Sequence, residues 1–350
     1  MAESGAERAA AAAVMDSWAR SMSPSRVFKA GIGGPLNEAS AHIRDITFHA
    51  SGNIVATGNE KGQINLYDAH KGERLVTVQN TAYGVSQLRF THHEHTLLHA
   101  TPRKKNSVWY LSVRENKYLR RFEGHEKSIS SVQVSPAHDE FISASEDGHF
   151  KIWDYRANKC SHGGKLNVGG RTVVAYNKNG NIFIVAGSDG IVKFWDRASL
   201  GNAPFQDFGP FEEAGDAKIV DVKILETEEL LLTLDSGKVM LVDGFDGSVM
   251  KIFDSFANQD HQTIPSITGD GNYLVASARS DGRSMVVHDV LDPEDAEPCA
   301  VLWGSMQHPG PIRAIAASPT SQLVVSGCDA ATVFWLPDDG SSAKLLRDTS

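Results

Sequence analysis

The sequence is poor in cysteine. Its 350 residues include three, Cys160, Cys299 and Cys328, which are odd in number and far apart in the chain. They form no CxxC pair and no disulfide pattern, so a reducing compartment is favoured over an extracellular one.

Long apolar runs are also absent. A bilayer-spanning helix needs about 20 apolar residues, and the run of residues 9–14 is far shorter. The acidic residues Glu3 and Glu7 near the start argue against an Arg-rich transit peptide. We therefore expect a soluble, intracellular protein that has no membrane partner.

An excess of positive charge is missing as well. The chain carries 34 basic and 43 acidic residues, a formal net charge of -9, which argues against direct binding of nucleic acid through its phosphates. The sequence has no phosphate-binding loop, no GxSxG motif and no paired carboxylates in a recognisable setting. Nothing in it points to an enzyme or to a cofactor.

Glycine is abundant, with 31 residues, and the chain is internally repetitive. Strand-like segments end in an aromatic or apolar marker at Tyr67, Trp109, Trp153, Trp195, Val242, His288 and Trp335, at intervals of 42, 44, 42, 47, 46 and 47 residues. A four-stranded blade of the WD-repeat type takes about 40–45 residues, with loop insertions added. Seven markers therefore predict an all-β fold, a seven-bladed WD-repeat β-propeller.

The interior of the repeats supports this fold. A turn glycine precedes the marker by five residues at Gly62, Gly148, Gly190 and Gly237, and by six at Gly282. Glycine supplies the positive φ that a tight hairpin requires. Apolar runs after upstream turns, such as 182–184 and 323–325, are typical of strands buried on both faces between neighbouring blades.

The two ends of the chain are expected to meet in one blade. The last repeat finishes at Trp335 without an outer strand, and the segment 26–29 is strand-like and could complete that blade. Such closure removes an open sheet edge. We expect residues 1–24 to form a flexible or partly helical arm, 25–337 the propeller, and 338–350 a disordered tail.

Serine, histidine and aspartate recur together, so nucleophilic catalysis has to be weighed. The most complete set is His125, Ser143, Asp147 and Trp153 in the third repeat. In WD repeats these residue types form a buried hydrogen-bonded tetrad, and a catalytic triad would not recur from blade to blade. We interpret the four residues as structural, with no catalytic residue among them.

A histidine cluster is the best candidate for a metal site. In the segment 92–95, His93 and His95 would share one side of a strand, with His99 further along. The alternative is a polar hairpin loop between Phe90 and Leu97. Because no cysteine or second histidine pair stands at zinc spacing, we favour the loop and predict no metal.

Basic and acidic residues are unevenly distributed. Residues 207–229 hold eight acidic side chains and two lysines, whereas a basic group lies in and after the second repeat and comprises Arg103, Lys104, Lys105, Arg120, Arg121 and Lys127. Such runs are usually solvated loops. The functional alternative is a bipolar surface that binds acidic or phosphorylated peptides on one side and basic partners on the other.

Several segments match one family more closely than a generic WD repeat requires. They are 83–85, 88–92, 116–125, 141–143, 153–156, 204–205, 247–250, 257–258 and 334–337. From about Asp16 to Pro337 the chain resembles the WD-repeat subunit family of COMPASS histone-lysine methyltransferase complexes. That family also joins the nuclear complex of PNUTS with protein phosphatase 1, and the yeast cleavage and polyadenylation factor.

The resemblance implies a non-catalytic adaptor in the nucleus. It would tether a histone methyltransferase or the PNUTS–phosphatase module to transcribing RNA polymerase II and support transcription termination, with recognition of the phosphorylated carboxy-terminal repeats. Phosphate recognition needs directed Arg or Lys donors, so the basic group named above supplies the candidate residues. The Ala-rich start and the acidic segment 207–229 depart from the family pattern.

Two other classes of function remain open at this point. One is a generic WD-repeat scaffold in another assembly, such as a ubiquitin ligase, which a list of partners would distinguish. The other is a metal-dependent enzyme built around the histidine cluster, which metal content after dialysis would distinguish.

Overall fold

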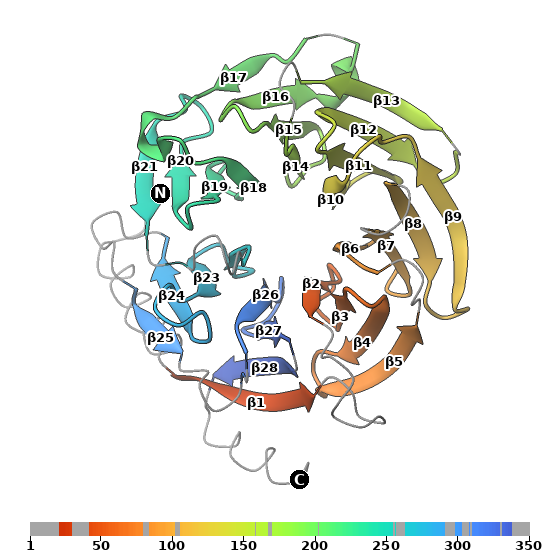
Figure 1. The fold of residues 1–350 in the computed structure, drawn as a ribbon, viewed down its shortest axis with the longest axis vertical. Helices are drawn as coiled ribbons and strands as arrows, with labels where there is room; N and C mark the ends of the chain where they lie inside the picture. Colours follow the sequence, from red (N-terminus) through yellow and green to blue (C-terminus); the bar gives the residue numbers. More distant parts are fainter. Residues whose placement is uncertain are drawn as a thin grey trace, which may run out of the picture.

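The chain folds into a ring of seven antiparallel sheets, each with four strands (Figure 1). The computed structural model describes residues 21–29, 42–79, 84–101, 106–157, 159–166, 170–201, 203–254, 256, 263–290, 298–302, 308, 310–329 and 331–337. The all-β, seven-bladed propeller expected from the repeat is confirmed. In the part of the chain so described, no helix is long and apolar enough to cross a membrane.

The blades follow one another in chain order. Blades 1 to 3 consist of β2 (Ile43–Phe48), β3 (Ile54–Asn59), β4 (Gln63–Asp68), β5 (Glu73–Gln79); β6 (Gln87–Phe90), β7 (Thr96–Ala100), β8 (Ser107–Ser112), β9 (Lys117–Glu123); and β10 (Ile129–Val134), β11 (Glu140–Ser145), β12 (His149–Asp154), β13 (Cys160–Lys165).

Blades 4 to 7 complete the ring. Their strands are β14 (Val173–Tyr176), β15 (Ile182–Ala186), β16 (Val192–Asp196), β17 (Gln206–Phe208); β18 (Ile219–Ile224), β19 (Leu230–Leu234), β20 (Val239–Val242), β21 (Val249–Phe253); β22 (Ser266–Ile267), β23 (Tyr273–Ser277), β24 (Met285–Asp289), β25 (Ala300–Leu302); and β26 (Ile312–Ala317), β27 (Val324–Cys328), β28 (Ala331–Pro337), β1 (Met22–Lys29). Two short 3-10 helices, η1 (Arg197–Ser199) and η2 (Glu212–Ala214), lie in loops of blades 4 and 5.

The marker residues of the repeat all lie in the third strand of a blade, from Tyr67 in β4 to Trp335 in β28. The turn glycines lie between the second and third strands and have positive φ, for example +88° at Gly62 and +78° at Gly148. Only glycine adopts such values without strain, which is why the tight turn recurs at that point of the repeat.

The hydrophobic core is divided among the interfaces between neighbouring blades. One cluster joins Leu98 and Val108 of blade 2 to Phe141 and Trp153 of blade 3, and six similar clusters join the other neighbours around the ring. The second strands β3, β11 and β19 are buried throughout because a blade packs against each of their faces. Every full burial of a large apolar side chain contributes about 1.5–3 kcal/mol, so these interfaces hold the ring together.

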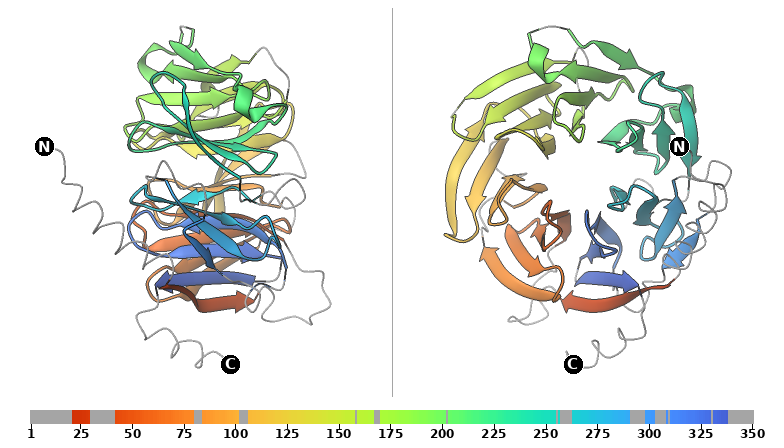
Figure 2. Two further views of the ribbon diagram at one scale, coloured as in Figure 1. Left: turned by 90° about the vertical axis from the view of Figure 1, so that its left-hand side faces the viewer. Right: turned by 180° about the vertical axis from the view of Figure 1, so that it is seen from behind.

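The ends of the chain meet in blade 7, as expected. Strand β1 pairs antiparallel with β28, with Val27 opposite Val333, and supplies the outer strand that the last repeat lacks (Figure 2). The strand begins at Met22, earlier than the predicted segment 26–29, because pairing continues past a register shift between Pro24 and Arg26 as far as Pro337. The first 20 residues of the predicted arm, and the predicted tail 338–350, lie outside the described residues.

Candidate functional site

Chain order fixes which loops share a face of the ring. In each blade the first strand is innermost and the fourth is outermost. Because neighbouring strands are antiparallel, the loops that enter each blade lie at the same end of the channel as the turns between second and third strands. We call this end the channel mouth.

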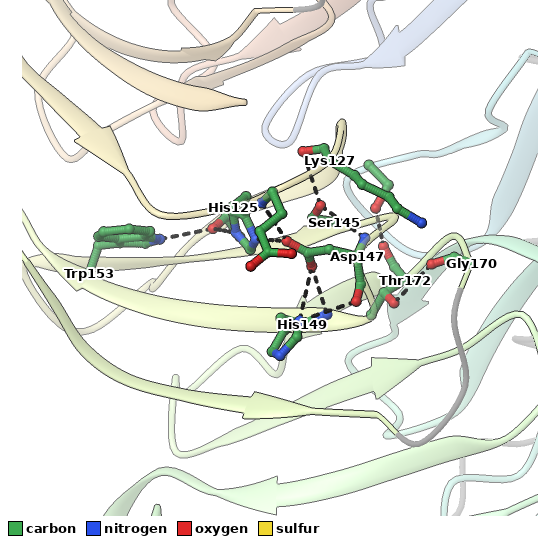
Figure 3. A network of polar contacts seen from close by, with 11 residues as sticks. His125, Lys127, Ser145, Asp147, His149, Trp153, Gly170 and Thr172 are labelled. Carbon is green, nitrogen blue, oxygen red and sulfur yellow. Dashed lines mark hydrogen bonds and ion pairs between the residues drawn. The ribbon is translucent and has the colours of Figure 1, made fainter. Parts of the chain in front are cut away.

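The four predicted residues of blade 3 form one chain of hydrogen bonds that runs from Trp153 in β12 to Asp147 in the turn at the channel mouth (Figure 3). The Trp153 indole donates to Ser143 Oγ at 2.8 Å, Ser143 Oγ lies 2.7 Å from His125 Nε2, and His125 Nδ1 lies 3.2 Å from Asp147 Oδ2. A carboxylate only accepts, so Nδ1 carries the proton and Nε2 accepts from the serine hydroxyl. Ser143 is also fully buried, so its hydroxyl has no open approach for a substrate, unlike that of a nucleophile.

Burial sets the charge state of this tetrad. His125 is 9% exposed, and the loss of solvation lowers the pKa of its imidazole to about 4, so the ring is neutral near pH 7. The pKa of Asp147 is lowered although burial opposes the shift, because its carboxylate accepts from the backbone N–H groups of Glu126 and His149. The pair is a neutral histidine hydrogen-bonded to a carboxylate.

A second set of this kind, which the sequence analysis missed, closes blade 7. His308 Nε2 lies 2.7 Å from Ser326 Oγ, which also accepts from the Trp335 indole at 2.7 Å. The spacing from histidine to serine, 18 residues, equals that between His125 and Ser143 and was visible in the sequence. Where the tetrad needs aspartate, four residues after the serine, the sequence has Ala330, and His308 Nδ1 has no hydrogen-bond partner among the described residues.

The tetrad also contacts the segment that leads into β14, the first strand of the next blade. Asp147 forms an isolated parallel bridge with Gly170, which has a φ of +135°. A Cβ on Gly170 would lie 2.4 Å from Ser188 Oγ, so glycine lets the chain pass close to its neighbour. Ser130 Oγ donates to the Thr172 carbonyl, and Asp147, Thr172 and Gly170 lie close together in Figure 3. Arg171 is thereby held between two anchored residues.

The channel mouth contains a cavity of about 650 Å³ to which all seven blades contribute. Its charged lining residues are Arg44, Arg171 and Arg313, together with Glu60 and Glu146. Arg44 Nη2 lies 3.0 Å from Glu60 Oε2, and Arg313 Nε lies 3.1 Å from Asp329 Oδ1. The lining thus has three positive and two negative groups, on a chain whose net charge is -9.

Deeper in the channel the wall carries buried charges. Arg89 Nη1 donates to Asp45 Oδ2 at 2.7 Å, and Asp45 also accepts from the Leu88 backbone N–H at 2.7 Å. Asp221 is 6% exposed, and burial raises the pKa of its carboxyl although Lys223 and Arg89 oppose the shift. Positive and negative groups of blades 1, 2 and 5 therefore compensate one another in this part of the channel.

Of the basic residues predicted to bind partners, the three that the structure describes, Arg120, Arg121 and Lys127, do not form one cluster. Arg120 and Arg121 are successive residues of β9, the outer strand of blade 2, and so face opposite sides of the sheet. Arg121 contacts Glu123 and Ser107 and lies 5.0 Å from the Trp109 ring centre. Lys127 lies at the channel mouth, exposed, with its carbonyl accepting from Ser145 Oγ at 3.1 Å. Residues Arg103, Lys104 and Lys105 lie outside the described residues.

The histidine segment forms the turn between β6 and β7, at the end of the ring opposite the channel mouth. Glu94 accepts from Ser51 Oγ at 2.8 Å, and His92 Nε2 lies 3.1 Å from the His138 carbonyl. Within the described ranges, no three His, Cys, Asp or Glu side chains are grouped so that they could hold a metal ion. The side chains of this turn thus hold neighbouring turns together.

The acidic segment 207–229 does not form one surface. Glu212, Glu213 and Asp216 are exposed near η2 at the channel mouth, whereas Glu226 and Glu228 are exposed in the turn after β18 at the opposite end. Asp221 between them is buried in the channel wall. The bipolar surface considered from the sequence is therefore not what this segment forms.

Comparison with protein-family models identifies the repeats. The model described as WD domain, G-beta repeat matches residues 116–154, 162–196 and 301–335. The model described as Anaphase-promoting complex subunit 4 WD40 domain matches residues 11–93.

Comparison with curated proteins finds relatives that match over most or nearly all of the chain. WD repeat-containing protein 82 of Drosophila melanogaster is 30% identical over 325 residues, which cover 93% of this chain and 97% of that protein. COMPASS component SWD2 of Saccharomyces cerevisiae is 24% identical over a match that covers 87% of this chain and 94% of that protein. Set1 complex component swd2 of Schizosaccharomyces pombe is 32% identical over 208 residues, 59% of this chain and 58% of that protein.

Proposed function

The chain belongs to the WD-repeat family of WD repeat-containing protein 82, and we propose that it is a non-catalytic adaptor subunit of a nuclear histone-lysine methyltransferase complex of the COMPASS type. The observation that carries this proposal is the similarity to that protein along nearly its whole length. Two further relatives are named as components of the Set1 complex and of COMPASS.

The arrangement of the polar residues supports an adaptor over a hydrolase. In blade 3 the serine hydroxyl is occupied by an indole donor and an imidazole acceptor, and the set without aspartate in blade 7 repeats this pattern. A nucleophile needs an open approach to substrate as well as a base, and both Ser143 and Ser326 are fully buried. Repetition in two blades at the same position is what a structural role requires.

The finer part of the proposal concerns the partners. The adaptor tethers the methyltransferase, or a PNUTS-like scaffold with protein phosphatase 1, to transcribing RNA polymerase II and supports transcription termination. It reads the phosphorylated carboxy-terminal repeats through basic side chains, of which exposed Lys127 at the channel mouth is the candidate best placed for a partner.

The adaptor role is tested by comparing the isolated chain with the complex. Recombinant chain should have no histone-lysine methyltransferase activity, whereas the tagged chain isolated from its own cells should carry that activity with it. Activity in the recombinant chain, or none in the isolated complex, would contradict the proposed role.

Phosphopeptide reading is tested by charge reversal. The double variant Lys127→Glu and Arg103→Glu should abolish binding of a phosphorylated carboxy-terminal repeat peptide, measured by fluorescence anisotropy. Arg156→Glu, at the end of the ring opposite the channel mouth, is the control. Unchanged affinity of the double variant would remove the assignment of these two residues.

A further inference from the structure

The arginines of the channel mouth differ in their partners. Arg44 is paired with Glu60, and Arg313 with Asp329. For Arg171 the described residues provide neither a hydrogen bond nor an ion pair, and its Nε is buried without an acceptor. Arg171 is therefore the mouth arginine whose charge is left without a counterion in contact.

An unpaired guanidinium in this position is costly. Burial lowers the pKa of Arg171, although the carboxylates of Asp221 and Glu146 favour its charged form from a distance. A buried donor without an acceptor costs about 1–3 kcal/mol, and more when it is charged. An anion that entered the cavity would supply the missing acceptor and reduce this cost.

The surroundings of Arg171 are those of a preformed site. The cavity measures about 650 Å³, within the range of about 300–1,000 Å³ typical of ligand pockets. Gly170 and Thr172 on either side of Arg171 are held by the Asp147 bridge and by Ser130. The backbone that carries the guanidinium is thus anchored to the tetrad of blade 3. Little further ordering of this segment is needed when a ligand binds, so less conformational entropy is lost.

We propose that the channel mouth is a binding site for an anionic side chain, phosphate or carboxylate, presented on a short peptide segment and paired with Arg171. The cavity is larger than the anionic group alone requires, and its lining includes apolar Val85 and Val239 beside polar Ser86 and Thr233. Peptide backbone and neighbouring side chains fit such a mixed lining. This site is distinct from the basic residues of β9, the outermost strand of blade 2, and from Lys127, which is not among the residues that line the cavity.

The test uses the full chain and three capped pentapeptides, Gly-Gly-X-Gly-Gly, where X is phosphoserine, glutamate or serine. Binding is measured by isothermal titration calorimetry. An anionic peptide should bind the wild-type chain and lose at least about tenfold in affinity with Arg171→Gln, since one partner of a desolvated charge pair is removed. Arg156→Gln, at the opposite end of the ring, should bind like wild type.

The phosphoserine and glutamate peptides decide between the two anions, because the tighter of them identifies the group that the site takes. Equal affinity of Arg171→Gln and wild type would overturn the proposal, and so would binding of the serine peptide as tightly as both anionic ones. If Arg171→Gln does not fold, Glu146→Gln serves instead. That exposed residue lines the same cavity, and loss of its negative charge should tighten binding roughly two- to fivefold, whereas no tightening would count against the site.

Discussion

Ser143 Oγ is shared by two buried rings, the Trp153 indole and the His125 imidazole. Removal of this oxygen leaves both ring nitrogens without a partner in a region that water does not reach. Each orphaned group costs about 1–3 kcal/mol. We expect Ser143→Ala to lower the free energy of unfolding by about 2–6 kcal/mol, the sum for two such groups, measured by urea denaturation.

Ser128→Ala is the matched control for this substitution, because Ser128 is an exposed serine in the loop that leads into blade 3. It should change the unfolding free energy by less than about 0.5 kcal/mol. Equal effects of the two substitutions would show that the tetrad contributes no stability of its own.

The buried histidines predict how stability depends on pH. Burial lowers the pKa of His99, His125 and His308 to about 4, below the value of about 6.5 in the unfolded chain. Between these values the unfolded state binds protons that the folded state does not, so stability falls as pH falls from 6.5 to 4. Carboxylates such as Asp147, whose pKa is lowered on folding, change the stability at pH values below this window.

We expect a loss of about 1.4 kcal/mol per pH unit for each of these histidines in the middle of the window, or about 4 kcal/mol per pH unit for the three together. Urea denaturation between pH 7 and 4.5 measures it. His99→Gln should remove about one third of the slope. An unfolding free energy that stays constant from pH 6.5 to 5 would contradict the assignment of neutral buried histidines.

At the scale of elements, strand β1 closes the ring. It supplies the outer strand of blade 7, and Met22 packs into the core between blades 6 and 7. A chain that lacks residues 1–29 would expose the edge of β28 and lose this burial. We expect a lower melting temperature and self-association in size-exclusion chromatography.

A synthetic peptide of residues 22–29 added in trans should partly restore the melting temperature of the truncated chain, and a scrambled peptide should not. A truncated chain that melts like the full chain would show that β1 does not close the propeller.

How much of this architecture the sequence predicted differs between elements. The markers and turn glycines predicted all seven blades. Each of these residue types is required locally, the apolar marker by a buried strand and the glycine by a turn with positive φ. The start of β1 was missed, since Met22, Ser23 and Pro24 show no strand pattern and pair only because β28 continues beside them. Long-range pairing of this kind leaves no periodicity in the sequence.

The candidate site was predicted only in part, because some of its residues belong to a local pattern and others do not. The four tetrad residues of blade 3 belong to one repeat and match the residue types of a WD-repeat tetrad, so their association could be inferred from the sequence. Arg171, by contrast, belongs to no motif and reaches the channel mouth through the bridge between Asp147 and Gly170 of the next blade. Residues gathered from all seven blades become neighbours only when the ring closes.

At the scale of the whole molecule, a closed ring of blades is a rigid frame that presents loops on two faces and a pocket on its axis. Seven separate cores hold neighbouring blades together, and the paired strands β1 and β28 contribute to two of them. Such a frame can hold several partners at fixed positions without moving, which is the property that an adaptor between an enzyme and its substrate assembly requires.

The central claim is that this chain is an adaptor in a nuclear methyltransferase or phosphatase complex. The most direct measurement is purification of the tagged chain from its own cells, with its partners identified by mass spectrometry. The account predicts recovery of a histone-lysine methyltransferase, or of a PNUTS-like scaffold with protein phosphatase 1. Recovery of cytoplasmic or ubiquitin-ligase partners alone would contradict it, and the propeller would then serve another assembly.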